Sequence, residues 1–351
     1  MFFVPLPFVV ALVLVYLLAQ MTWRQGVVVI ANRRFRLLLG GYALLSTLVG
    51  MRWAYDVKQL LPLQATLAVC LAPWSWYCYQ TLAGALPSLA WRIFMGLPAL
   101  LMLGLVRWWP AGIDALVVLV FLGYGLALLR LARRGPDALG LARLDEALLA
   151  HRALIATAAI LLVSALVDVF IAWDMRSSGG SHSAALVGSF QLFGLLLWGT
   201  AASVAGQSLP DVEPSAALRR EEPVNPLNAD SPAPDLAEDQ RIVAVLHGLM
   251  QQQQLYLELD LNLLRMARKS GIPARQISAA VNRVEGKNVS QYVNDFRVGY
   301  ACRLLRETAH SVTDVMLASG FQTKSNFQRE FRRVTGTTPL LWREQAAGSP
   351  A

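Results

Sequence analysis

The sequence predicts an all-α protein in two parts: a polytopic transmembrane bundle of about seven helices, followed by a smaller soluble helical domain. The first observation is composition, with 55% hydrophobic and only 15% charged residues and a mean hydropathy of +0.44. Soluble proteins usually carry about 25% charged residues. The second is that the long apolar runs are confined to residues 1–205. The third is that apolar residues recur at helical spacing beyond residue 240.

Charge divides the chain in the same way. The net charge is +7 over residues 1–205, −6 over 206–240 and +7 over 241–351. The acidic stretch is rich in proline and lacks apolar periodicity, so it cannot bury enough surface to offset the entropy of ordering. We therefore expect a disordered linker at 206–240, a folded domain at 241–345 and a short tail at 346–351.

Seven apolar runs are candidate spans, because about 20 apolar residues are needed to cross the hydrocarbon core of a bilayer. The runs are 3–21, 37–51, 60–79, 91–106, 113–129, 153–172 and 184–205. Six or eight spans are alternatives, since the second and fourth runs are short and contain Gly or Pro. Loops on one side carry 12 Lys and Arg and loops on the other carry 4. The positive-inside rule then places the C-terminus in the cytoplasm and the N-terminus outside.

Two further features of the apolar half carry predictions. Asp168 lies inside the sixth run, where an ionisable group is costly and suggests a functional site, so we take it as a possible signal site. The alternative is a carboxyl near the outer end of the span that reaches water or a neighbouring helix. Residues 137–150 alternate leucines with charged residues, which predicts a short amphipathic helix on the inner membrane surface.

The C-terminal part contains an internal repeat. Seven residues of the first copy correspond to seven of the second, with one residue's difference in the middle: Asn262, Gly271, Ile277, Val281, Gly286, Val289 and Tyr292, and Ser311, Gly320, Phe327, Phe331, Gly336, Pro339 and Trp342. Each copy has a helix-capping side chain, a short helix, a turn glycine and a second helix, at 274–285 and 324–334. The repeat predicts two helix-turn-helix units joined by one helix over 290–307.

The stretch from Asp260 to Arg343 resembles the DNA-binding domain of the AraC/XylS transcriptional regulators. The second copy carries most of the likeness, through Ala301, Leu304, Leu305, Thr308, Val312, Asp314, Val315, Gly320, Phe321, Ser325, Phe327, Phe331, Gly336, Thr338, Pro339 and Arg343. The resemblance implies seven helices around two helix-turn-helix units that bind two adjacent major grooves. Two positions depart from the pattern: Pro273 replaces a capping Ser, and Met316 replaces an Ala.

Polar residues on the two second helices are the candidate DNA contacts, because Asn and Gln pair with adenine and Arg and Lys pair with guanine or phosphate. The candidates are Arg275, Gln276, Asn282 and Arg283 in the first unit, and Gln322, Lys324, Ser325, Asn326, Gln328, Arg329, Arg332 and Arg333 in the second. We expect Lys324, Ser325, Gln328 and Arg329 to contact bases, and Arg332 and Arg333 to contact phosphates.

These observations predict a sequence-specific transcriptional regulator embedded in the bacterial inner membrane, responding to a small or membrane-borne signal. Double-stranded DNA and the bilayer are the expected partners. RNA polymerase and a second copy of the chain are further expected partners. One alternative is a transporter or integral-membrane enzyme with a regulatory tail; another is a regulator that the bundle only anchors. The four histidines are scattered, and no HExxH or phosphate loop is present, so no catalytic, cofactor or metal site is expected.

Overall fold

The computed structural model describes residues 6–23, 30–55, 57–85, 89–144, 146–177 and 236–348. Over these residues the chain forms helices joined by short turns, with one isolated β-bridge and no strand. The all-α prediction is therefore confirmed for the described part of the chain. The chain divides into an N-terminal unit, Met1–Leu139 with Leu149–Leu218, and a C-terminal unit, Gly140–Leu148 with Arg219–Ala351.

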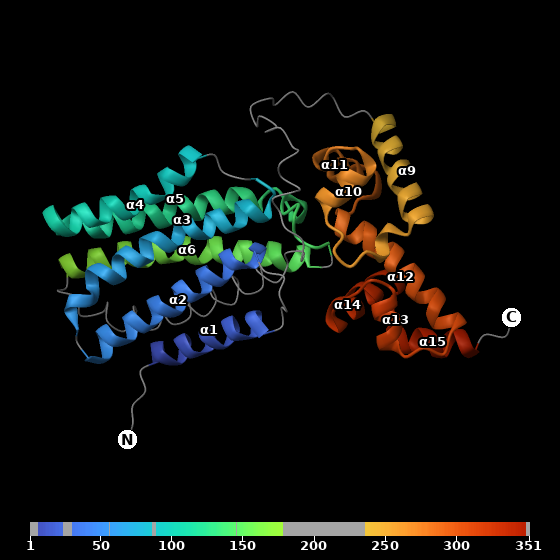
Figure 1. Ribbon diagram of the computed structural model, residues 1–351, viewed down its shortest axis with the longest axis horizontal. Coiled ribbons are helices and arrows are strands. Elements are labelled where there is room, and N and C mark those ends of the chain that lie inside the picture. Colours follow the sequence, from blue (N-terminus) through green and yellow to red (C-terminus); the bar gives the residue numbers. More distant parts are fainter. Residues whose placement is uncertain are drawn as a thin grey trace, which may run out of the picture. The chain divides into compact units, whose positions relative to one another are not determined.

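Six long helices make up the described part of the N-terminal unit (Figure 1). They are α1 (Leu6–Trp23), α2 (Ile30–Tyr55), α3 (Leu61–Leu82), α4 (Leu89–Trp108), α5 (Ile113–Ala132) and α6 (Ala147–Ser177). Each coincides with one of the first six apolar runs. The seventh run, 184–205, lies outside the described residues.

Polar side chains join these apolar helices. The hydroxyls of Tyr42 on α2 and Ser75 on α3 are 2.6 Å apart, and those of Tyr79 on α3 and Thr157 on α6 are 3.0 Å apart. Hydrogen bonds of this kind hold helices together where apolar surroundings offer no other partner. Gly125 lets α5 approach α6, because a Cβ there would lie 2.9 Å from a methyl group of Leu162.

The expected number of spans is not supported. Among the described residues, two helices are long and apolar enough to cross a membrane, Pro110–Ala132 and Ala147–Asp174, and two apolar segments are shorter, Pro7–Gln20 and Met95–Trp108. Two of the predicted runs, 37–51 and 91–106, fall short of the roughly 20 residues that a span requires. The helices that contain them, α2 and α4, carry arginine near both ends.

Seven helices form the described part of the C-terminal unit (Figure 1). They are α9 (Leu236–Gln253), α10 (Leu263–Ser270), α11 (Ala274–Glu285), α12 (Val289–Glu307), α13 (Val312–Ala318), α14 (Lys324–Thr335) and α15 (Pro339–Gly348). The helix α9 begins at Leu236, inside the predicted linker, whose remaining residues 206–235 are not described. The helices α11 and α14 lie where the repeat predicts its two second helices.

The repeated sequence gives a repeated local structure. Asn262 caps α10 by accepting from the Arg265 N–H at 2.8 Å, and Ser311 caps α13 by accepting from the Asp314 N–H at 3.1 Å. The turns after these helices use Gly271 and Gly320 at φ of +71° and +83°, the left-handed region that glycine enters without strain. The two predicted helix-turn-helix units, α10 with α11 and α13 with α14, are therefore confirmed.

Two buried clusters form the core of this unit. The first combines side chains of α9, the short 3-10 turn Leu255–Leu257, α10, α11 and the beginning of α12. The second combines the end of α12 with α13, α14 and Trp342 of α15. The helix α12 contributes to both clusters and so fixes the two helix-turn-helix units on a common rod (Figure 1).

The amphipathic helix predicted at 137–150 is wrong over residues 139–144. A short 3-10 turn covers Pro136–Ala138, a turn and the β-bridge residue Arg143 follow, and α6 begins at Ala147. Leu141 and Leu144 are buried, and Leu144 belongs to the first core cluster. The leucines thus have a protein core as their apolar environment, which the amphipathic pattern alone does not distinguish from a membrane surface.

Replacing Phe331 with alanine should destabilise the second core by about 3–5 kcal/mol, because a fully buried aromatic ring would leave a cavity. Hydrogen exchange of α12 and α14 peptides in the full chain measures this as a lower free energy of opening. Val334→Ala, at an exposed position of the same helix, is the control. Equal exchange in the two variants would contradict the assignment of Phe331 to this core.

Candidate nucleic-acid interface

The helix α14 has an apolar inner face and a polar outer face. Phe327 and Phe331, four residues apart, are buried against α12 and α13. Predicted DNA contacts exposed on the remaining faces include Lys324, Ser325, Gln328, Arg329 and Arg332. The helix begins at Lys324, so the first three lie in its opening two turns, the part that a helix-turn-helix presents to base edges.

Asn326 and Glu330 lie on the buried side of α14 and orient the arginines beside them. Asn326 is 5% exposed, and its Oδ1 accepts from Arg329 Nη2 at 2.5 Å. Glu330, also buried, accepts from Arg329 Nε at 3.1 Å and Arg333 Nε at 2.9 Å. Asn326 is therefore placed as a support for Arg329, whose side chain remains 46% exposed. Gln322 is half-buried in the turn before the helix.

Arg333 connects α14 to α12. Its Nη2 donates to Asp295 Oδ1 at 2.6 Å, and its side chain is only 28% exposed. Asp295 also accepts from Lys287 Nζ at 2.8 Å, so one carboxylate joins the end of the first unit to the second. This arrangement fits Arg333 as a residue that positions α14, beside its predicted role as a phosphate contact.

In the first unit, Arg275, Gln276 and Asn282 are exposed on α11. Arg283 differs, because it donates through Nε and Nη2 to the two carboxylate oxygens of Asp239 on α9, at 2.5 and 2.7 Å. These hydrogen bonds hold the pKa of Asp239 below its usual value. Asp239 was assigned to the linker from sequence, so its pairing with a predicted DNA contact was missed.

Arg297 is a structural residue of α12, and its spacing of four residues from the buried Val293 and Ala301 is the sequence signal that could have found it. It is fully buried, and it donates to the carbonyl oxygens of Tyr256 at 2.7 Å and Glu258 at 3.0 Å. Its guanidinium also lies 5.7 Å from the ring centre of Phe321, in the turn of the second unit. The buried cation thus joins the segment between α9 and α10 to the turn of the second helix-turn-helix unit.

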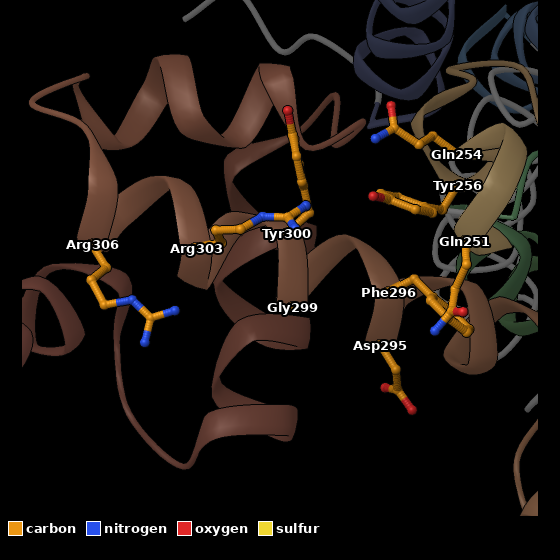
Figure 2. A pocket seen from close by; sticks show the side chains of 9 residues that line it. All are labelled: Gln251, Gln254, Tyr256, Asp295, Phe296, Gly299, Tyr300, Arg303 and Arg306. Atoms are coloured by element: carbon orange, nitrogen blue, oxygen red, sulfur yellow. The ribbon is translucent and has the colours of Figure 1, made fainter.

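An open cavity of about 680 Å³ lies between one face of α12 and the segment that ends α9, and Figure 2 shows the side chains that line it. Tyr256 and Phe296 stack at its wall, and the Arg303 guanidinium lies 5.1 Å from the Tyr300 ring centre. None of its lining residues is a predicted DNA contact. It touches that set only through Asp295, the partner of Arg333.

In the N-terminal unit, Asp168 lies half-buried on α6. The three cysteines, Cys70, Cys78 and Cys302, are free thiols. No group of three or more potential metal-ligating side chains occurs within the described ranges.

Comparison with known proteins agrees with this geometry. Residues 266–345 match the family described as helix-turn-helix domain. The C-terminal unit contains a helix-turn-helix domain. The match begins within α10 and ends within α15, so it covers both of the units that the repeat predicts, apart from the first three residues of α10.

Curated relatives are similar to part of the chain. The HTH-type transcriptional activator RhaR of Cronobacter sakazakii is 31% identical over 74 residues, which are 21% of this chain and 26% of that protein. RhaR of Yersinia pseudotuberculosis is 24% identical over 115 residues, 33% of this chain and 38% of that protein. The chain spans 26–42% of the length of the first relatives.

Among solved structures, an AraC-type DNA-binding domain-containing transcriptional regulator from Chromobacterium violaceum is 25% identical. The likeness covers 32% of this chain and 99% of that one, with a TM-score of 0.29.

If Arg333 acts by positioning α14, Arg333→Ala and Asp295→Ala should weaken binding to random DNA to a similar extent. The double variant should then lose little more than either single variant, since both changes break the Arg333–Asp295 pair, which predicts a coupling of about 1 kcal/mol. Binding titrations of the three full-length variants measure this cycle. A phosphate-contact role predicts the opposite: Asp295→Ala would retain or strengthen binding while Arg333→Ala loses it.

Proposed function

We propose that this chain is a membrane-embedded, sequence-specific DNA-binding transcriptional regulator of the AraC type. The observation that carries the proposal is the pair of helix-turn-helix units on α12, with the exposed polar face of α14. The match of residues 266–345 to the helix-turn-helix domain family and the partial similarity to helix-turn-helix transcriptional activators support it. On this proposal double-stranded DNA is the ligand, and the two units occupy neighbouring major grooves of one site.

The exposed residues of α14 divide the recognition chemistry between bases and backbone. An Arg can donate two hydrogen bonds to guanine, and a Gln can pair with adenine; each good pair discriminates by about 1–3 kcal/mol. Arg329 and Gln328, with Lys324 and Ser325, are our base contacts. Arg332 is exposed without the ties to α12 that hold Arg333, so it is our phosphate contact in the second unit.

We place the N-terminal half in the bacterial inner membrane. Two helices of span length and the excess of Lys and Arg in alternate loops support this placement. The C-terminal unit then lies in the cytoplasm, where the DNA is. The bundle would respond to a small or membrane-borne signal, with Asp168 on α6 as the candidate site, and a second copy of the chain and RNA polymerase would be its protein partners.

Arg329→Ala should reduce binding to the cognate site far more than binding to random DNA, because it removes a base contact. Arg332→Ala should weaken both alike and make binding less dependent on salt, because each lost phosphate contact releases fewer counterions. The two variants are matched, since both remove one arginine from one helix. Gel-shift titrations at several salt concentrations compare them. Equal losses on both DNAs for Arg329→Ala would refute the base contact.

The membrane placement predicts that the full chain stays in the membrane pellet after alkaline carbonate extraction. Trypsin should remove the C-terminal unit in inverted inner-membrane vesicles but not in sealed right-side-out vesicles. Release of the chain by carbonate would refute the embedding, and digestion from the outer face alone would refute the orientation.

A further inference from the structure

Residues Gly140–Leu148 run from the connection after α5 into the first two residues of α6, yet they belong to the C-terminal unit. They are inserted between two helices of the N-terminal unit, whereas the residues they pack on come more than a hundred positions later. The segment is therefore a second covalent link between the units, distinct from the stretch 206–235.

Apolar burial holds this segment in the first helix-turn-helix core. Leu144 is 2% exposed and belongs to the same buried cluster as Leu261, Leu263 and Val289. Ala142 and Leu141 beside it are buried as well. A leucine in such a cluster has almost no exposure to water, so the packing of Leu144 is part of the protein core rather than a surface contact.

Backbone hydrogen bonds fix the segment in register. Arg143 forms an antiparallel β-bridge with Asn262, and the Leu144 N–H donates to the Leu261 carbonyl at 3.0 Å. The Ser290 hydroxyl, in the first turn of α12, donates to the Leu144 carbonyl. The contacts thus reach both α12 and the residues that lead into α10.

The start of α10 depends on this segment. The first N–H groups of a helix have no partner within it and need acceptors from elsewhere. The Asn262 side chain accepts from Arg265, and the Gly140 carbonyl accepts from the Leu264 N–H at 3.3 Å. One of the two acceptors that begin the first helix-turn-helix unit therefore comes from the connection between α5 and α6.

We propose that Gly140–Leu148 is a docking element through which the N-terminal half holds the first helix-turn-helix unit, and that displacing it weakens DNA binding by that unit. The proposal goes beyond the proposed function, because the docking itself can be measured without DNA. On this proposal the predicted linker is not the only physical connection between the N-terminal half and the first helix-turn-helix unit. The segment Gly140–Leu148 is a second one, because it continues into α6 and contacts α10 and α12.

The test cuts the linker of the folded, full-length protein. A specific protease site is placed within residues 211–235 and cleaved after purification in detergent, with an affinity tag at the N-terminus. The C-terminal fragment should co-purify with the tagged fragment, because Gly140–Leu148 remains docked on it. Leu144→Asp should release most of the fragment, since it places a charge in the core. Leu259→Asp, at a position 48% exposed in the same unit, should retain it.

Hydrogen exchange in the uncut chain distinguishes local loss of docking from general unfolding of the C-terminal unit. Peptides covering 261–266 should exchange at least tenfold faster in Leu144→Asp than in the unchanged chain, while α14 exchanges at the same rate in both. Ser290→Ala, which keeps Leu144 and removes only the hydroxyl donor, should give a smaller increase at the same peptides. Release of the fragment from the unchanged chain, or equal retention of the Leu144→Asp and Leu259→Asp fragments, would overturn the docking.

DNA footprinting separates this inference from the proposed function. Leu144→Asp should lose protection over the half-site of the first unit and keep it over the half-site of the second. Equal protection of both half-sites would overturn the second part of the proposal. If the unchanged chain binds no specific DNA but its cut fragments stay together, the proposed function fails and the docking stands.

Discussion

The buried guanidinium of Arg297 is the interaction on which the C-terminal unit depends. Burying a cation is costly unless hydrogen bonds replace the water that it loses. Here the carbonyls of Tyr256 and Glu258 accept from it, and the ring of Phe321 lies beside it. Gly320 completes the arrangement, because a Cβ there would lie 3.0 Å from the Tyr256 carbonyl oxygen and 3.2 Å from Arg297 Nε. The turn of the second helix-turn-helix unit is thus built around one side chain of α12, whose position also sets that of the first.

Carboxylates decide which of the basic residues are available to DNA. Asp239 holds Arg283, Asp295 holds Arg333, and Glu330 holds Arg329 and Arg333 together. Such pairs order the long arginine side chains before any ligand arrives, which lowers the entropy lost when those side chains bind. They also reduce the local positive charge. On the proposed function, the recognition surface is therefore narrower and more ordered than the sequence predicts, and it is centred on the exposed face of α14.

The segment Gly140–Leu148 shows why an amphipathic pattern gave a wrong prediction of a helix on the membrane surface. Leucines spaced among charged residues suit a membrane surface and a protein core equally, because apolar burial is non-directional and depends on area alone. Leu144 packs among Leu261, Leu263 and Val289, residues more than a hundred positions away, so no local pattern could identify its partner. For the same reason the sequence did not predict the pairing of Asp239. Its neighbours along the chain are those of an acidic linker, but its partner Arg283 is on α11.

The sequence by itself determined most of the helices, together with the caps and turns of the two helix-turn-helix units. Asn262, Ser311 and Gly271 act on groups within a few residues, so their spacing is sufficient evidence for two helix-turn-helix units. Six apolar runs likewise predicted α1 to α6. How many of these helices are membrane spans depends on helix length and on the charged residues near the helix ends, which the apolar runs alone do not fix. Only the tertiary structure decided the pairing of Arg333 with Asp295, the burial of Asn326 and Arg297, and the docking of Gly140–Leu148. The Arg333–Asp295 pair, the contacts of Arg297 and the docked segment each join residues far apart along the chain, and the free energy that selects them exists only once the helices have packed.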